Sequence, residues 1–572
     1  MMILRIFTIT LLAILAHLPA MAQSGGGNAQ NSLLPDINPQ DIEIRSEFKA
    51  RFPGLRRQPI LGFNPKPRVF RIDPDRMPFM ESREDAVAGI EVTNLDRPRP
   101  PVRRILSTPL RRSGYIRAGI GSYITPEIEA YGFSQINEQS QLLGDLNFRA
   151  SDGHLEDNLG SFRYMDASVN YVNKVNESLR FSVDVGGLYD FNKMIQPEGL
   201  AIQNIGITDK DYTGAGGTIT LENIQNSLDG WRISVGGNAF SVDVNAGENS
   251  LTGEVNEQRY HASASKYWAG QRMYETFDIT GGVEGGRYKS TGLETEQWIN
   301  AKASLEYSRL LNFNMHISAR GGVEYISDAF SEKIYIAPGL KLKHNLRDAV
   351  LLTANLYAKP EMQSVQEHHQ YNRFLNFETQ LRHSYKTGLD AEIAFQPIEG
   401  NRIFGGLSFN HIRDYAYYQR AEVISQNGGE FGFYDVNYGD ANIFEIYAGI
   451  TQQLVPEKFW FTAKLYGRSP SLSDGGDIPY EERLGLEGSL SYKPVKNLTI
   501  SSWAEYVGPR ADPNAMEDLN AFALINGGAE YQINERFGVY AKVLNILGQK
   551  YEIWNGYEER PFQVFGGLTI KL

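Results

Sequence analysis

The feature that most constrains this chain is an alternation of apolar and polar side chains with a period of two residues. Residues 178–190 carry the apolar members Leu179, Phe181, Val183, Val185 and Tyr189. Residues 299–308 and 459–465 repeat the pattern. Because successive side chains of a strand point to opposite faces, each segment shows one face to an apolar medium and the other to water. Segments of about 10 to 14 residues also fit a tilted bilayer crossing. The pattern predicts an all-β, transmembrane antiparallel β-barrel.

The N-terminus has the layout of a secretory signal peptide. Arg5 provides the positive charge, residues 6–18 are largely apolar, and Ala20 and Ala22 frame a small-x-small cleavage site. Such a segment is too short and wrongly flanked to be a membrane span. We therefore predict a cleavable signal peptide at 1–22 and a mature chain that begins near Gln23. Export together with a barrel predicts the outer membrane of a diderm bacterium.

Composition excludes several other classes. The 572 residues include 31 Tyr, 29 Phe and 56 Gly but no Cys, and the mean hydropathy is −0.37. Without cysteine there is neither a disulfide framework nor a lipoprotein anchor. No later stretch has the 18 or more apolar residues of a spanning helix. On composition alone a soluble secreted β-protein remains possible, so the barrel prediction depends on the alternation.

Connection lengths add an asymmetry. Tight polar turns are predicted at 174–177, 345–348, 455–458, 494–497 and 533–536, and longer polar stretches at 191–211, 360–382, 414–439 and 469–481. Short periplasmic turns and long outer loops are the expected arrangement of such a barrel. Strand-by-strand reading from Gly114 to Leu572 gives about 22 segments. This even number leaves both ends of a barrel domain at 113–572 in the periplasm.

Three passages resemble the barrels of TonB-dependent receptors. The first is 372–378 with 389–397, and the second is 506–510 with 527–531. The third and most specific is 543–552, followed by a last strand at 562–572, which resembles the C-terminal signature of that family. The resemblance implies a 22-stranded barrel that acts in transport across the outer membrane.

Two departures from that family are visible. The family carries an N-terminal plug domain of well over a hundred residues, preceded by a short box for the energising protein. Here only about 90 residues separate the signal peptide from the first predicted strand, and they contain no plug-like motif. We therefore expect a barrel without the plug domain. The final residue is Leu572 instead of a terminal aromatic residue, although Val564, Leu568 and Ile570 still alternate as an insertion signal would.

The pre-barrel segment is strongly basic. Residues 23–44 read as a flexible tether, and residues 45–112 hold 16 Lys and Arg against 8 Asp and Glu, a charge of +8. Since the whole chain carries −12, the remainder carries −20. Ten of the 25 prolines fall here and exclude a regular helix. The segment could fill the lumen, dock a periplasmic partner or form a disordered tail. The candidate lumen- or partner-binding residues are Arg51, Arg56, Arg57, Arg68, Arg71, Arg103 and Arg104.

Catalytic, metal and cofactor sites are poorly supported. No Ser, His and Asp set can be assembled, so we predict no enzyme. The stretch 367–369 could bind a metal, but a solvated loop is the more ordinary interpretation. The stretch 474–482 has four carboxylates that could hold divalent ions, but a hydrated charged loop is the more ordinary interpretation. The glycines of 281–286 lie in an alternating strand, not in a phosphate-binding turn. We predict no catalytic residue, no metal and no cofactor.

Aromatic residues near strand ends are typical of the two membrane interfaces. We assign Trp231, Trp460, Trp503 and Trp554 to these girdles. The expected partners are outer-membrane lipid and lipopolysaccharide, the barrel-insertion machinery, a small solute and a possible periplasmic protein. Nucleic acid is excluded, because the compartment is wrong and the chain is acidic. Two functions stay open: a transporter or channel gated by the basic segment, and a non-transporting structural component of an outer-membrane complex.

Overall fold

The computed structural model describes residues 113–572, except 156–158, 195–207, 227–228, 247–250, 273, 292, 348, 377–379, 399, 421–433 and 513–517. The predicted signal peptide, tether and basic segment lie outside the described residues, as do all seven candidate arginines. Those assignments stay predictions. Within the described part, no helix has the length and apolar character needed to cross a membrane.

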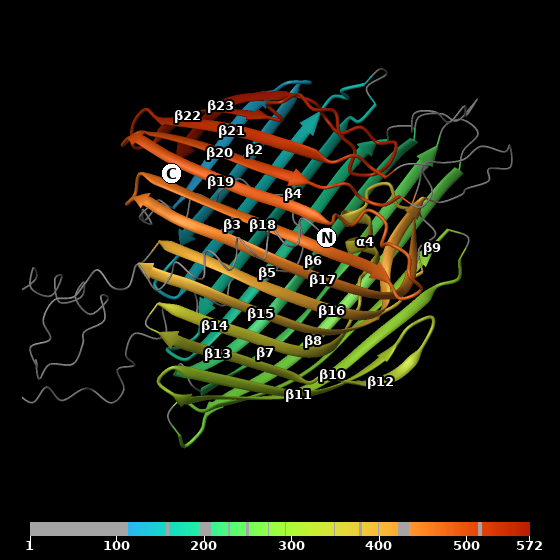
Figure 1. The fold of residues 1–572 in the computed structure, drawn as a ribbon, viewed down its shortest axis with the longest axis vertical. Helices are drawn as coiled ribbons and strands as arrows, with labels where there is room; N and C mark the ends of the chain where they lie inside the picture. Colours follow the sequence, from blue (N-terminus) through green and yellow to red (C-terminus); the bar gives the residue numbers. More distant parts are fainter. Residues whose placement is uncertain are drawn as a thin grey trace, which may run out of the picture. The chain divides into compact units, whose positions relative to one another are not determined.

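One antiparallel sheet of 23 strands makes up the described chain (Figure 1). Its strands are β1 (Gly114–Gly121), β2 (Thr125–Gln135), β3 (Ser140–Ser151), β4 (Phe162–Lys174), β5 (Leu179–Lys193), β6 (Thr208–Asn226), β7 (Asp229–Ala246), β8 (Leu251–Ala269), β9 (Thr276–Ser290), β10 (Glu296–Asn312), β11 (Met315–Ser327), β12 (Glu332–Ile336), β13 (Gly339–Arg347), β14 (Val350–Glu361), β15 (Ser384–Ile398), β16 (Asn401–Arg420), β17 (Tyr434–Val455), β18 (Phe459–Leu472), β19 (Leu484–Val495), β20 (Leu498–Val507), β21 (Phe522–Gln532), β22 (Phe537–Leu544) and β23 (Gln563–Lys571). A helix, α4 (Val365–Tyr371), lies between β14 and β15.

The sheet closes on itself, because β1 pairs with β23 as well as with β2. Closure gives the first and last strands hydrogen-bonded neighbours on both sides, and the interior of a bilayer requires such pairing of backbone groups. β12 and β13 both pair with β11 and form one crossing, interrupted at Ala337 and Pro338. Proline lacks the N–H that a continuous ladder needs at this point. The barrel therefore has 22 crossings, which confirms the predicted fold and strand number.

The two ends of the barrel differ as predicted, although β16 and β17 extend into the stretch 414–439 that was predicted to be a loop. Tyr115 near the start of β1 pairs with Lys571 near the end of β23, so the barrel begins and ends at one rim. The connections at this rim are short; the one between β15 and β16, for example, contains only Glu399 and Gly400, and Gly400 has a φ of +80°. The long connections 362–383, 473–483, 508–521 and 545–562 lie at the opposite rim, here called the outer rim.

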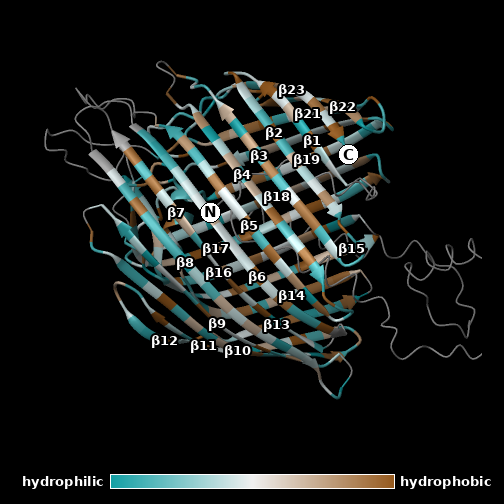
Figure 2. Ribbon diagram, turned by 180° about the vertical axis from the view of Figure 1, so that it is seen from behind, coloured by the Kyte–Doolittle hydropathy of each residue, from teal (hydrophilic) through white to brown (hydrophobic). Residues whose placement is uncertain are grey.

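Hydropathy alternates along the strands, and Figure 2 shows this as neighbouring brown and teal bands. Outward-facing Val185, Ile219 and Val235 are 56%, 51% and 54% exposed, an arrangement that requires an apolar surrounding medium. The inward face carries polar residues, many of them paired across strands. Glu222 on β6, for example, accepts hydrogen bonds from Arg180 at 3.0 Å and from Arg232 at 2.9 Å. The interior wall is therefore polar, as expected for a lumen.

Candidate functional site

The connection between β14 and β15 comprises residues 362–383, and we call it the gate loop. Its described residues, 362–376 and 380–383, fold inward across the lumen. Its partners include inward-facing residues of β6, β7, β8 and β9, on a wall several strands away from β14 and β15. A ring of 22 strands about 4.8 Å apart and tilted by about 40° is roughly 40 Å across. A connection of this length can reach the far wall and return, whereas the short turns at the other rim cannot.

Helix α4 binds the far wall through its N-terminus. The backbone N–H groups of Val365 and Gln366 donate to the Glu257 carboxylate of β8 at 3.3 and 3.2 Å. Ser364 and Glu367 form a capping box that satisfies two further N–H groups. The first N–H groups of a helix have no partner within the helix and carry partial positive charge, so a carboxylate is a favourable partner. Glu257 is 1% exposed, and Arg259 Nε lies 3.9 Å from its carboxylate, so the guanidinium and the helix N-terminus both stabilise its charge.

The side chain of Gln366 joins two neighbouring strands of the same wall. Its Oε1 accepts from Asn238 Nδ2 on β7 and from Arg259 Nη2 on β8, both at 2.8 Å. Arg259 Nε also donates to Asn238 Oδ1 at 3.0 Å. The three side chains form a closed set of hydrogen bonds that fixes the helix laterally.

The chain after α4 is held by a buried lysine. Lys210 Nζ of β6 donates to the carbonyl oxygens of Arg373 and Leu375 at 3.0 and 2.6 Å, and Tyr212 donates to the first of these carbonyls at 3.1 Å. Lys210 is fully buried. A buried ammonium without a directly bonded carboxylate is costly unless carbonyl dipoles solvate it. The gate loop supplies those dipoles, so its position and the lysine charge depend on each other.

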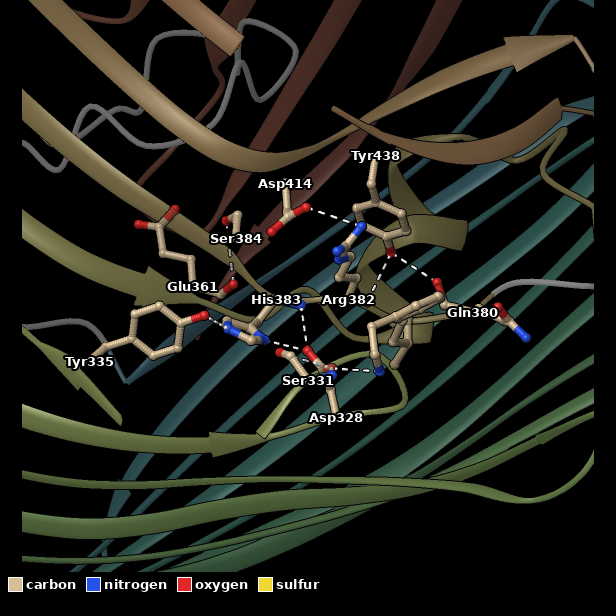
Figure 3. A network of polar contacts seen from close by, with 12 residues as sticks. Asp328, Ser331, Tyr335, Glu361, Gln380, Arg382, His383, Ser384, Asp414 and Tyr438 are labelled. Carbon is tan, nitrogen blue, oxygen red and sulfur yellow. Dashed lines mark hydrogen bonds and ion pairs between the residues drawn. The ribbon is translucent and has the colours of Figure 1, made fainter. Parts of the chain in front are cut away.

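The last part of the gate loop is fixed by a second polar network (Figure 3). His383 bonds Asp328, in the β11–β12 turn, through Nδ1 and through its backbone N–H, and its Nε2 lies 2.8 Å from the Tyr335 hydroxyl. Burial alone would raise the pKa of Asp328, but the His383 hydrogen bonds outweigh it and lower that pKa to about 2. The hydroxyl of Tyr438 accepts a hydrogen bond from the backbone N–H of Arg382 and donates one to the carbonyl oxygen of Gln380.

Between these anchors lies an apolar core inside the barrel. It joins the gate loop to the walls and to the loop 545–562, and its buried members include Val242, Val255, Val365, Phe374, Leu375, Leu381, Tyr418, Tyr434, Trp554 and Tyr557. Phe374 stacks on Tyr557 with ring centroids 3.5 Å apart. Burial of this kind is worth about 25 cal/mol per Å² of apolar surface. The gate loop is thus held as a domain core is, which distinguishes it from an open loop.

Two histidines of α4 are buried in this contact. His368 and His369 are each 1% exposed. His368 Nδ1 lies 2.9 Å from the Tyr418 hydroxyl, whereas its Nε2 and both ring nitrogens of His369 have no hydrogen-bond partner among the residues that the structure describes. Burial lowers the pKa of His368 to about 4 and holds the pKa of His369 well below 6.5, where nearby Lys210 adds repulsion. Both rings are therefore neutral in the closed position.

The metal interpretation of residues 367–369 does not fit this geometry. Glu367 caps the helix, His368 faces Tyr418 and His369 faces the Tyr212 ring, so the three side chains do not converge. Across the described residues, no group of three or more His, Asp or Glu side chains is arranged to hold a metal ion. The expectation of a solvated loop was wrong here, since a helix with two buried imidazoles occupies it.

The acidic stretch 474–482 is only partly the hydrated loop that the sequence suggested. Asp477 pairs with Arg483 at the surface. Glu481, half-buried, and Glu482, buried, lie beside Arg468, whose Nη1 is 3.9 Å and 2.7 Å from their carboxylates. Burial, followed by the charge of Glu482, raises the pKa of Glu481. This pair braces the outer rim and does not present a site for divalent ions.

The predicted interface tryptophans occupy different environments. Trp231 lies on the same outward face of β7 as Ile233 and Val235, and its girdle assignment stays a prediction. Trp460 shares the inward face with Lys464. Trp503 is 7% exposed and sits opposite Ser489 and Asn526. Trp554 is 6% exposed and packs on aromatic rings of the core inside the outer rim. An interface position is therefore wrong for Trp554, because loop packing removes it from the lipid side.

Sequence reasoning missed the residues that hold the gate loop. The one local signal was Ser364 followed three positions later by Glu367, a helix-start pattern within a stretch predicted as a loop. Lys210, Glu257 and Arg259 gave no such signal. They stand in strands as ordinary inward-facing polar residues, and their partners lie more than 100 positions away.

Replacing Ser364 by Ala tests whether α4 needs its cap. We expect a loss of about 1 kcal/mol, which corresponds to roughly fivefold more local opening, because one helix N–H loses its acceptor. Trypsin cleavage after Arg373, whose carbonyl is bonded in the closed position, measures the opening. Ser473→Ala, in another outer connection, is the matched control. Equal cleavage of the two variants would show that the cap does not stabilise the gate loop.

No family model and no curated protein matches the sequence. Solved structures do match the fold. The ferric-catecholate import receptor Fiu from E. coli K12 has a TM-score of 0.63 at 10% identity, covering 82% of each chain. The ferric enterobactin receptor PfeA from Pseudomonas aeruginosa has a TM-score of 0.63 at 11% identity over 80% of each chain. The copper transporter OprC has a TM-score of 0.64 at 11% identity, over 81% of this chain and 80% of that one. These neighbours are TonB-dependent receptors, and the described chain shares their barrel fold.

Proposed function

We propose that this protein is an outer-membrane channel of TonB-dependent-receptor-like type that passes a small solute through a gated barrel. The observation that carries the proposal is the gate loop, which crosses a polar lumen and is bonded to the opposite wall by Glu257, Gln366 and Lys210. A scaffold that only docks partners has no evident need for a mouth closed by neutral histidines and a buried lysine. The neighbours named for ferric-catecholate import, ferric enterobactin and copper support a small solute.

The basic segment 45–112 forms a second closure inside the lumen. Its +8 charge faces an inner wall that carries Asp145, Asp166 and Asp184 on β3, β4 and β5. Asp145 lies opposite Ser168 and Asp184 opposite Asn170, two and four residues along β4 from Asp166. Among the described residues none of the three pairs with Lys or Arg; Asp145 accepts from Ser168 and Asp184 from Asn170. Each exposed ion pair contributes little, but several arginines act together on a confined strip. The segment in this way replaces a folded plug.

Single-channel conductance in planar bilayers tests this function. We expect the full mature protein to be silent or nearly so, and a version lacking residues 45–112 to conduct, because a 22-stranded barrel is wide enough to need filling. Equal conductance of the two proteins would place the segment outside the pore. Silence of both, also after the gate loop is removed, would favour a structural component of an outer-membrane complex.

A further inference from the structure

A cavity of about 510 Å³ lies in the inner wall formed by β4 to β10, beside the contact of α4 with that wall. Strand register arranges its inward-facing residues in rows across the strands. One row runs through Asp184, Thr218, Gly236, His261 and Glu284, each the direct cross-strand partner of the next. The neighbouring row, nearer the gate loop, runs through Gly186, Gly216, Asn238 and Arg259.

Two glycines of this part of the wall lie so close to their cross-strand neighbours that a larger residue does not fit. A Cβ at Gly216 would lie 2.7 Å from Asn238 Cβ, and one at Gly236 would lie 2.5 Å from Thr218 Oγ1. A side chain at either position would therefore displace polar groups of the wall. Farther from the outer rim, the next inward-facing row of the wall consists of Ser182, Thr220, Ser234 and Ser263. The cavity itself is lined by the hydroxyl-bearing Ser168 and Thr218 and by His261.

Opposite charges stand at the two ends of the cavity. Asp184 lies on β5, and Arg259 lies three strands and two residues away on β8. Strand spacing of about 4.8 Å and a rise of about 3.4 Å per residue put their Cα atoms roughly 16 Å apart. Lys302 and Glu284, 3.9 Å apart and half exposed, flank the arginine end. An extended chain advances about 3.3 to 3.6 Å per residue, so three or four residues span the gap between the side chains.

The arginine end is also part of the gate. Arg259 and Asn238 line the cavity and both donate to Gln366 Oε1. A guanidinium binds a carboxylate more strongly than a neutral amide, because the hydrogen bonds are charge-assisted and can be bidentate. Glu257 and Glu367 lie 3.9 Å from the Arg259 guanidinium, beyond hydrogen-bond distance. A carboxylate that arrives from the lumen therefore competes with Gln366 for the Arg259 hydrogen bonds.

We infer that this cavity binds a linear zwitterion, of which a short extended peptide is the commonest form. The ammonium group lies at Asp184, the carboxylate lies at Arg259, and occupancy releases Gln366 and loosens the gate loop. The inference rests on the proposed channel function and names its solute class.

Isothermal titration with tetra-alanine, on the full mature protein and on the version lacking 45–112, tests the binding. Loss of one charge-assisted pair is worth about tenfold in affinity or more. We expect Asp184→Asn and Arg259→Gln each to weaken tetra-alanine binding to this extent. N-acetyl-tetra-alanine and tetra-alanine amide should bind the unsubstituted protein correspondingly less. Glu487→Gln, an equal charge change on the inner face of β19, is the matched control and should leave the affinity within about twofold.

Coupling to the gate has its own readout. Saturating tetra-alanine should raise trypsin cleavage after Arg373 several-fold, and Gln366→Ala should raise it without peptide. The proposed binding site is wrong if tetra-alanine binds to neither protein. It is also wrong if Asp184→Asn and Arg259→Gln leave the affinity unchanged. Binding without any change in cleavage overturns the coupling. Because titration needs no ion flow, a failed site is distinguishable from a failed channel, which only the conductance comparison decides.

Discussion

Replacing residues 363–382 with a short Gly–Ser linker should raise single-channel conductance at least about fivefold in the protein that lacks residues 45–112. The described gate loop buries an apolar core inside the mouth and bonds to β6, β7, β8 and β9, so its removal clears the mouth of the barrel. The barrel itself should persist, because β14 and β15 pair with each other independently of the gate loop.

The matched control carries the same linker inserted into the 136–139 turn, at the rim where the barrel begins and ends. Its conductance should equal that of the parent. Heat-dependent migration on gels and circular dichroism establish that both variants keep the barrel. An unchanged conductance after loop removal, in a barrel that is still folded, would mean that the loop lies beside the conducting path.

Acidification should open the gate loop between about pH 6.5 and pH 4. In the closed position His368 has a pKa of about 4 and His369 one well below 6.5, because both are buried. In the open loop both pKa values return to about 6.5. The open state thus binds more protons in this window, and the free energy that favours the closed loop decreases as the pH falls through it. Above about pH 6.5 both histidines are neutral in the open and the closed loop, and this free energy no longer depends on pH. At pH 4.5, His368 alone destabilises closure by about 2.5 kcal/mol, roughly 50-fold to 100-fold in the opening equilibrium.

The groups that face the two histidines determine the sign of this effect. Lys210 on β6 repels any imidazolium, and the hydroxyl of Tyr418 on β16 contacts only one nitrogen of His368. The carboxylates nearby, Glu257 and Glu367, are engaged by the helix N-terminus and the capping box. No carboxylate hydrogen-bonds either ring among the described contacts, so protonation is not compensated in the closed position.

A nitroxide on Gln380→Cys reports this opening without a background signal, since the chain has no cysteine. Its spectrum should become mobile on going from pH 7 to pH 4.5. Exchange of both His368 and His369 for Gln should remove that change, and His344→Gln, at the opposite rim, should keep it. If the double variant still opens with acid, the histidines are not the titrating groups.

Much of the barrel followed from the sequence. The alternation over 178–190 became β5, that over 299–308 lies within β10, and the strand count agreed because each crossing is a local pattern repeated along the chain. The passage 360–382 was correctly placed between strands, but its interior was not. Composition marked it as polar, and polarity alone does not distinguish a loop in water from one bonded to a polar wall.

The sequence by itself determined an antiparallel barrel with a polar interior, short turns at one rim and long connections at the other. It did so because side-chain alternation and turn composition act over a few residues at a time. The tertiary structure alone decided that the gate loop crosses the lumen and that Trp554 is in a buried core. It also decided that Arg259 both lines the cavity and hydrogen-bonds to Gln366 of α4. These depend on contacts such as Lys210 with Leu375, 165 positions apart. Only closure of the ring brings such residues together.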